Sequence, residues 1–148
     1  MSIYTQTIQG VYVALVSGVR NATQTILGST LIDPKSAQSD SRLQTGINTE
    51  VSGLIAYLDI TVVPGVDTLQ LVLEEQDPAS GKWIQVAATT ATAAVSTVVM
   101  KVKQAITAVA ASPTGVRVQD TLPAIWRLRV VHSAGTNFTY SLGVVLYN

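Results

Sequence analysis

Three leucines occupy every second position of residues 68–74, TLQLVLE. Successive side chains of an extended chain point to opposite faces, so the leucines share one face, as in a β-strand that is buried on one side. A similar alternation recurs in residues 54–62, LIAYLDITV, in residues 126–131, WRLRVV, and in residues 138–146, FTYSLGVVL. These segments predict strands that each pack one face against a common core.

Short turn sequences separate these segments. They are PGVD at residues 64–67, DPASGK at residues 77–82 and SAGTN at residues 133–137. Proline pre-sets φ for a turn and glycine accepts positive φ, which suits tight connections. Strands joined by such turns, without a long helical period, predict an all-β fold, an antiparallel β-sandwich or barrel.

We expect strands near residues 10–17, 22–32, 50–63, 67–75, 83–88, 96–103, 115–119, 125–132 and 138–147. Residues 104–113 should be irregular or form a short extra strand. The shared faces of neighbouring strands should line the core with Leu69, Leu71, Leu73, Trp126, Leu128, Val130, Phe138, Tyr140, Leu142 and Val144.

Composition favours a single domain over residues 1–148 that works with partners. The 148 residues carry no cysteine, nine basic and nine acidic side chains, and a charged fraction of 12%. Ordinary globular domains carry about 25% charged residues. A lone monomer with so few charges is poorly protected against self-association, so we expect a homo-oligomer whose surface is largely covered. The balanced charge argues against a nucleic-acid partner.

Signals for export or membrane insertion are absent from the sequence. The first ten residues, MSIYTQTIQG, contain no basic stretch followed by an apolar one, so we expect no signal peptide. The apolar runs are too short to span a bilayer, so we expect no membrane partner.

The usual motifs of catalytic and cofactor sites are missing as well. His132 is the only histidine, and we interpret it as a strand-end residue with local hydrogen bonds. Zinc-binding, nucleotide-binding and serine-hydrolase spacings do not occur. Glu74, Glu75 and Asp77 could offer oxygen ligands to calcium, but a solvated turn is the preferred interpretation. We therefore expect no enzyme, no cofactor and no metal, although folding could still bring a catalytic carboxylate pair together.

Two segments do not fit the strand pattern. Residues 1–10 look like an N-terminal arm, and residues 33–46, DPKSAQSDSRLQTG, form a long polar loop. Both could be disordered or could order on a partner or a sister subunit. The arm could also pack back on its own sheet. The candidate partner-binding residues in these segments are Ile3, Tyr4 and Ile8 as apolar anchors, and Lys35, Asp40 and Arg42 as rim contacts.

Two arginines form a further candidate. Arg127 and Arg129 project from one face of a predicted strand beside Trp126. Arginine next to an aromatic residue is common at protein interfaces. A pair of solvated arginines on the polar face of the strand is an equally good interpretation.

Several segments together resemble a known family. They are residues 66–83, VDTLQLVLEEQDPASGKW, residues 122–130, LPAIWRLRV, and residues 138–143, FTYSLG. They resemble small virion proteins of tailed phages, some of which are capsid decoration or cement proteins, and the resemblance covers about residues 50–147. It implies a β-sandwich, with a jelly roll as one candidate form, that binds the outer capsid shell as an oligomer.

The function that follows is structural. We expect a virion protein, made in the cytoplasm of the host bacterium, that binds the major capsid protein on the capsid surface and stabilises the capsid by bridging capsomers. The family's habit of occupying threefold positions favours a trimer over a dimer. The alternatives are a head–tail connector, a tail-tube or tail-terminator protein, and a carbohydrate-binding β-sandwich on the virion.

Overall fold

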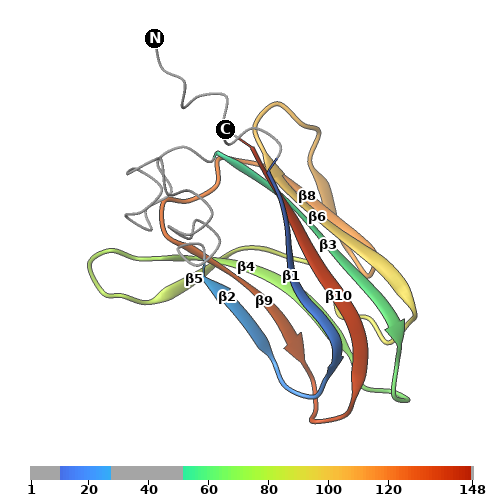
Figure 1. Ribbon diagram of the computed structural model, residues 1–148. Coiled ribbons are helices and arrows are strands. Elements are labelled where there is room, and N and C mark those ends of the chain that lie inside the picture. The colour runs from blue at the N-terminus through green and yellow to red at the C-terminus, as the bar shows by residue number, and fades with distance from the viewer. Residues whose placement is uncertain (1–10, 28–51, 148) are drawn as a thin grey trace.

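A computed structural model describes residues 11–27 and 52–147 of the chain, and these ranges form ten strands and no helix (Figure 1). The expected strands are confirmed within these ranges, although the expected strand near residues 22–32 is described only as far as Leu27. A short strand also forms within residues 104–113. The strands are β1 (Val11–Arg20), β2 (Gln24–Leu27), β3 (Gly53–Val62), β4 (Leu69–Gln76), β5 (Trp83–Ala88), β6 (Ser96–Lys103), β7 (Val109–Ser112), β8 (Gly115–Gln119), β9 (Trp126–His132) and β10 (Phe138–Tyr147).

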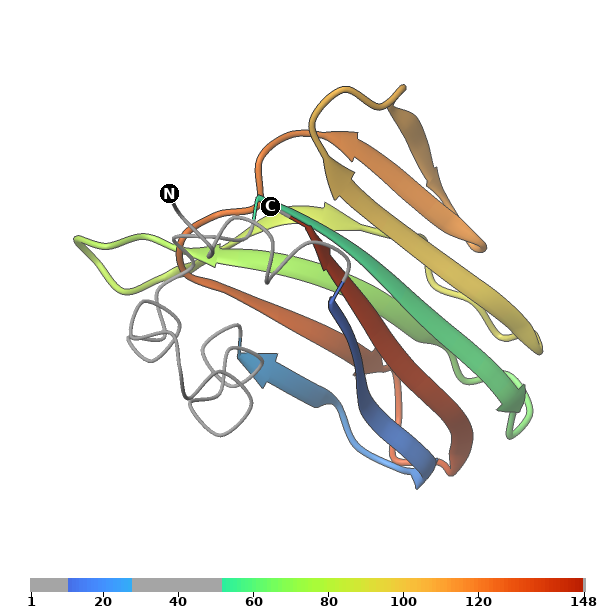
Figure 2. The ribbon, with the colours of Figure 1, turned by 45° about the horizontal axis from the view of Figure 1, so that its top comes forward.

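The strands form two sheets that face each other as layers (Figure 2). One sheet has the order β1-β10-β3-β6-β8-β7 and the other has the order β2-β9-β4-β5. Without β7 and β8, each sheet has four strands, and this is the strand order of a jelly roll, a sandwich built from two Greek keys. The predicted all-β sandwich is confirmed. Between the ten described strands all pairs are antiparallel except β6 with β8, which run parallel.

A hairpin of β7 and β8 is inserted between β6 and β9. It extends the six-stranded sheet beyond β6, as Figure 2 shows. The three residues Val109, Ala110 and Ala111 of β7 are exposed, and in β8 only Val116 is buried in the core, with Val118 packed against it. The hairpin therefore adds little to the core that holds the two sheets together.

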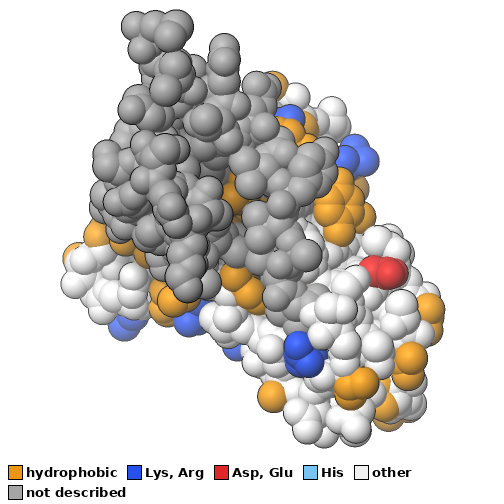
Figure 3. Space-filling model, viewed as in Figure 1, with side chains coloured by type: hydrophobic (Ala, Val, Ile, Leu, Met, Phe, Trp, Pro, Cys, Tyr) orange, Lys and Arg blue, Asp and Glu red, His pale blue; other side chains and the backbone are white. Residues whose placement is uncertain are grey.

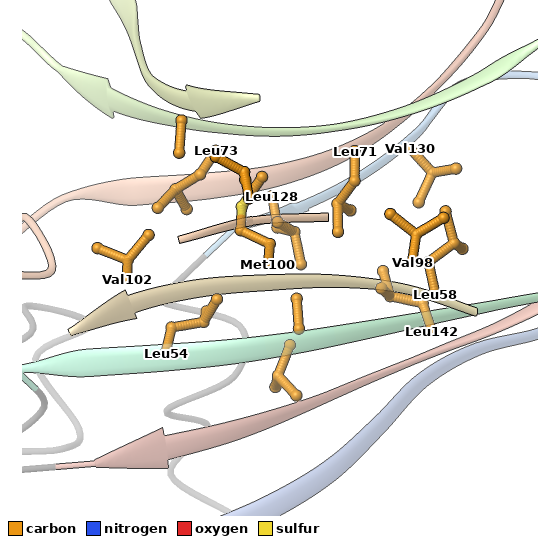
Figure 4. Packing of buried hydrophobic residues seen from close by; sticks show 14 of the residues in the cluster. Leu54, Leu58, Leu71, Leu73, Val98, Met100, Val102, Leu128, Val130 and Leu142 are labelled. Carbon is orange, nitrogen blue, oxygen red and sulfur yellow. The ribbon is translucent and has the colours of Figure 1, made fainter. Parts of the chain in front are cut away.

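The core lies between the two sheets, where side chains from both layers interdigitate (Figure 4). Alternation along β4, β9 and β10 places their apolar residues on the inner face. All ten residues that the sequence predicts in the core are buried. Met100 of β6 and Leu54 and Leu58 of β3 complete the contact from the six-stranded sheet.

Two of the predicted turns contain a glycine with a positive φ angle. Gly65 in the β3–β4 turn has φ of 84°, and Gly81 in the β4–β5 loop has φ of 72°. Both values lie in the region that glycine adopts without strain.

No helix within residues 11–27 and 52–147 is long and apolar enough to cross a membrane.

Candidate functional site

The two predicted arginines lie on the outer face of the four-stranded sheet and hold one carboxylate between them. Arg127 pairs with Glu74 in the register of β9 with β4. The Arg127 Nε donates a hydrogen bond to Glu74 Oε2, and an Arg129 guanidinium nitrogen donates to Glu74 Oε1 at 3.3 Å. Glu74 is only 9% exposed. Because both arginines already bind a side chain of their own sheet, they are not simply solvated.

An aromatic ring completes this cluster of Glu74, Arg127 and Arg129. The guanidinium carbon of Arg127 lies 4.4 Å from the centre of the Trp83 ring, which belongs to β5, on the other side of β4 from β9. A cation over an aromatic face is attracted by the ring's quadrupole. The cluster therefore joins three strands of one sheet. A contact between these arginines and a partner stays a prediction.

The other six predicted site residues lie outside the described residues. Residues 1–10 include three of them, Ile3, Tyr4 and Ile8, and the loop at residues 33–46 includes Lys35, Asp40 and Arg42. Their roles in partner binding also stay predictions.

His132 makes the local hydrogen bond that its sequence position suggested. Its Nε2 lies 3.0 Å from the Tyr140 hydroxyl, and its ring meets the Phe138 ring edge-on at 5.3 Å. Burial lowers the pKa of the His132 imidazole and raises the pKa of the Tyr140 hydroxyl to about 12. Both groups are therefore neutral at physiological pH and serve packing between β9 and β10.

Two of the three acidic residues considered for calcium bind groups of the chain itself. Glu74 binds the two arginines. Asp77 accepts hydrogen bonds from the Ser80 hydroxyl at 2.5 Å and the Ala79 amide at 3.0 Å, and these bonds lower the pKa of its carboxyl. Within residues 11–27 and 52–147 no group of three or more acidic, histidine or cysteine side chains is placed to hold a metal ion.

A set of exposed valines gathers at one end of the sandwich. Val62 ends β3, Val66 lies in the β3–β4 turn, and Val95 directly precedes β6, which starts opposite Ile60. Val19 belongs to the same row, because it pairs with Thr139, which pairs with Val62 on its other side. These four side chains are between 52% and 90% exposed. We call this surface the valine end.

The valine end lies at the lower right of the molecule in Figure 1, and Figure 3 shows hydrophobic side chains at the surface there. Sequence patterning does not reveal this surface, because its members come from separate segments that only folding brings together. One signal was available: Val66 is an apolar residue inside a turn, where polar residues are usual.

Comparisons with known proteins inform the fold alone. No family model matches the chain, and no curated protein matches it. Among solved structures, the chain is similar to the one described as "Crystal structure of Yersinia pseudotuberculosis-derived mitogen (YPM)", with a TM-score of 0.51 and 12% sequence identity. The match covers 94% of this chain and 88% of that one, so the likeness extends over the whole sandwich.

Proposed function

We propose that this chain is a structural virion protein that binds the outside of a phage capsid and stabilises it by bridging capsomers. Its partner is the major capsid protein, and it acts as a homo-oligomer, with a trimer preferred over a dimer. The resemblance of residues 66–83, 122–130 and 138–143 to small virion proteins supports this origin. The charged fraction of 12% suits a surface that is covered by partners.

The valine end is the observation that carries the proposal. Its valines lie at the ends of strands or in short turns, so a packed framework holds them in place. Burying one such side chain against a partner contributes about 1–2 kcal/mol. Four valines therefore give a modest contact for one protomer, and an oligomer attached at several points multiplies it by avidity.

Binding at such a surface stabilises the capsid by mass action. A protein that binds only the assembled shell shifts the equilibrium toward that shell by an amount set by its concentration and affinity. Such a role requires a stiff scaffold and an apolar contact surface, and the packed sandwich with its exposed valines supports the proposal.

The test uses heads of the parent phage that lack this protein. The purified chain is mixed with these heads, and the bound fraction is measured by co-sedimentation. We expect the wild type to bind and Val66→Asp to bind at least tenfold more weakly, which corresponds to about 1.4 kcal/mol. The matched control is Ile84→Asp on β5, which alters another exposed apolar residue, but at the opposite end of the sandwich. It should bind like the wild type.

Two results would count against the proposal. Wild-type chain that stays in the supernatant at micromolar concentration would reject capsid binding. Equal binding by Val66→Asp would reject the valine end as the contact. The oligomeric state is tested separately, by light scattering of the free chain. A chain that is a monomer both in solution and on heads would contradict the proposed homo-oligomer.

A further inference from the structure

A groove lies on the outer face of the six-stranded sheet, between β3 and the inserted β7–β8 hairpin. Its volume is about 330 Å³, which lies within the range of small-ligand sites. Tyr57 of β3, Val99 and Lys101 of β6, Thr114 of the hairpin turn and Arg117 of β8 line it. Figure 3 shows basic side chains beside hydrophobic ones at the upper right, where Figure 1 places β6 and β8.

Two positive charges lie side by side in this groove. Lys101 and Arg117 are direct partners in the parallel register of β6 with β8, and both side chains line the groove. Like charges in directly opposite positions destabilise a sheet. The chain has only nine basic residues, and within the described residues neither Lys101 nor Arg117 forms an ion pair. An anion bound between them would relieve this repulsion.

The structure of the hairpin fixes the backbone of β8, which carries Arg117, close to β6. A Cβ atom at Gly115 would lie 2.3 Å from the Val99 carbonyl oxygen, so glycine is needed for β8 to start so close to β6. The Ser112 hydroxyl accepts hydrogen bonds from the Thr114 and Gly115 amides and fixes the turn before β8. Since the hairpin adds little to the core, forming one wall of the groove is its clearest contribution.

An aromatic ring lies on the β3 side of the groove. Tyr57 is 41% exposed and pairs with Val99, directly beside the start of β8. The apolar C–H face of a sugar ring packs well on such an aromatic surface, while the tyrosine hydroxyl remains available as a polar group. The planar guanidinium of arginine binds a carboxylate or sulfate through two parallel hydrogen bonds.

We propose that this groove binds an anionic sugar, with its carboxylate or sulfate held between Lys101 and Arg117 and its ring against Tyr57. A nucleic-acid strand is less well matched, because strand binding requires a longer basic track and several stacking rings. The net formal charge of the chain is zero, and the groove offers one ring and one pair of cations. This site is independent of the valine end.

The experiment titrates the full chain by calorimetry and NMR with four probes. They are a galacturonic acid trisaccharide, a sulfated disaccharide derived from heparin, the neutral galactose trisaccharide, and a short thymidine oligonucleotide. We expect one of the two anionic sugars to bind with a Kd on the order of 1 mM or tighter, and to bind more weakly as salt is raised. The carboxylated and sulfated probes distinguish the two sources of negative charge.

Variants locate the site. Lys101→Gln combined with Arg117→Gln should weaken binding of the anionic sugar at least tenfold, and so should Tyr57→Ala. Arg20→Gln is the matched control, because it removes a partly exposed cation from β1 on the far edge of the same sheet, and its affinity should be unchanged. The Lys101→Gln, Arg117→Gln variant should be as stable as the wild type or more stable, because it removes a repulsion.

Several outcomes would overturn the proposal. They are equal affinity for the neutral trisaccharide, tighter binding of the oligonucleotide than of either anionic sugar, and no binding of either anionic sugar at about 10 mM. Unchanged affinity in the double variant would also overturn it. A double variant that unfolds more easily than the wild type would show that the two cations stabilise the sheet, which contradicts a repulsion between Lys101 and Arg117.

Discussion

Replacing Glu74 with glutamine should lower the free energy of unfolding by about 2 kcal/mol. Glu74 accepts hydrogen bonds from both Arg127 and Arg129, and its side chain is mostly buried. A hydrogen bond to a charged group contributes about 1.5–3 kcal/mol when it is shielded from water. Glutamine keeps the shape and one acceptor oxygen, but its amide group then meets the other arginine with donor facing donor. One charge-assisted bond is lost and the second is weakened.

The effect is smaller than for a fully buried ion pair, since the arginine side chains are 23% and 30% exposed. Water screens part of the repulsion that the substitution leaves between them. Arg127 also keeps its contact with the Trp83 ring, which limits the loss further.

Urea unfolding followed by the fluorescence of the buried Trp126 measures this change. The matched control is Glu75→Gln, one residue further along β4. The Glu75 carboxylate makes no ion pair within the described residues. This substitution should therefore change the free energy of unfolding by less than about 0.5 kcal/mol. A double-mutant cycle of Glu74→Gln with Arg129→Gln should give a coupling energy of at least about 0.5 kcal/mol. If Glu74→Gln is as mild as Glu75→Gln, the cluster does not stabilise the sheet and the arginines are free for a partner.

Two further predictions concern the core and the single histidine. Leu71 is fully buried, so Leu71→Ala should lower the free energy of unfolding in urea by about 2–5 kcal/mol. Gln70→Ala, on the opposite face of β4, should lower it much less. A loss below about 0.5 kcal/mol for Leu71→Ala would contradict the inward orientation of Leu71 in β4. Burial lowers the pKa of His132 below its ordinary 6.5, so the unfolded chain binds the proton more readily. Stability should therefore fall as the pH drops below about 6.5 and stay constant just above it. His132→Gln should remove the loss of stability that begins as the pH falls through about 6.5, and a variant that retains the wild-type slope there would refute the assignment.

Much of the fold was predictable because alternation is a local signal. The pattern of Leu69, Leu71 and Leu73, with its counterparts in β9 and β10, places side chains on one face whatever the strand pairing. Strand β7 is different. It is short and rich in alanine, and it is set by pairing with β8 through Val109 and Ser112. No local pattern of residues 109–112 distinguishes that strand from an irregular loop.

The candidate sites were harder to predict because they depend on register. Arg127 is recognisable in the sequence as an outward residue, yet its partner Glu74 lies 53 positions away and meets it only through the pairing of β4 with β9. Lys101 and Arg117 become neighbours only because the inserted hairpin returns parallel to β6. Sequence patterning identifies which face a side chain occupies, and the pairing of strands decides which charges meet.

The valine end and the anionic-sugar groove occupy different parts of the same sheet, so one chain can carry both. Strand β6 begins next to Val95 at the valine end and reaches Lys101 five residues after Ser96, which is about 16 Å along an extended strand. The groove opens on the outer face of the sheet, whereas the valines cluster at its end. A protomer attached to a capsid through its valines therefore leaves Tyr57, Lys101 and Arg117 facing the solvent. In that arrangement capsid stabilisation would depend on the strand ends and turns, and sugar binding would depend on the inserted hairpin, so each proposal can fail without affecting the other.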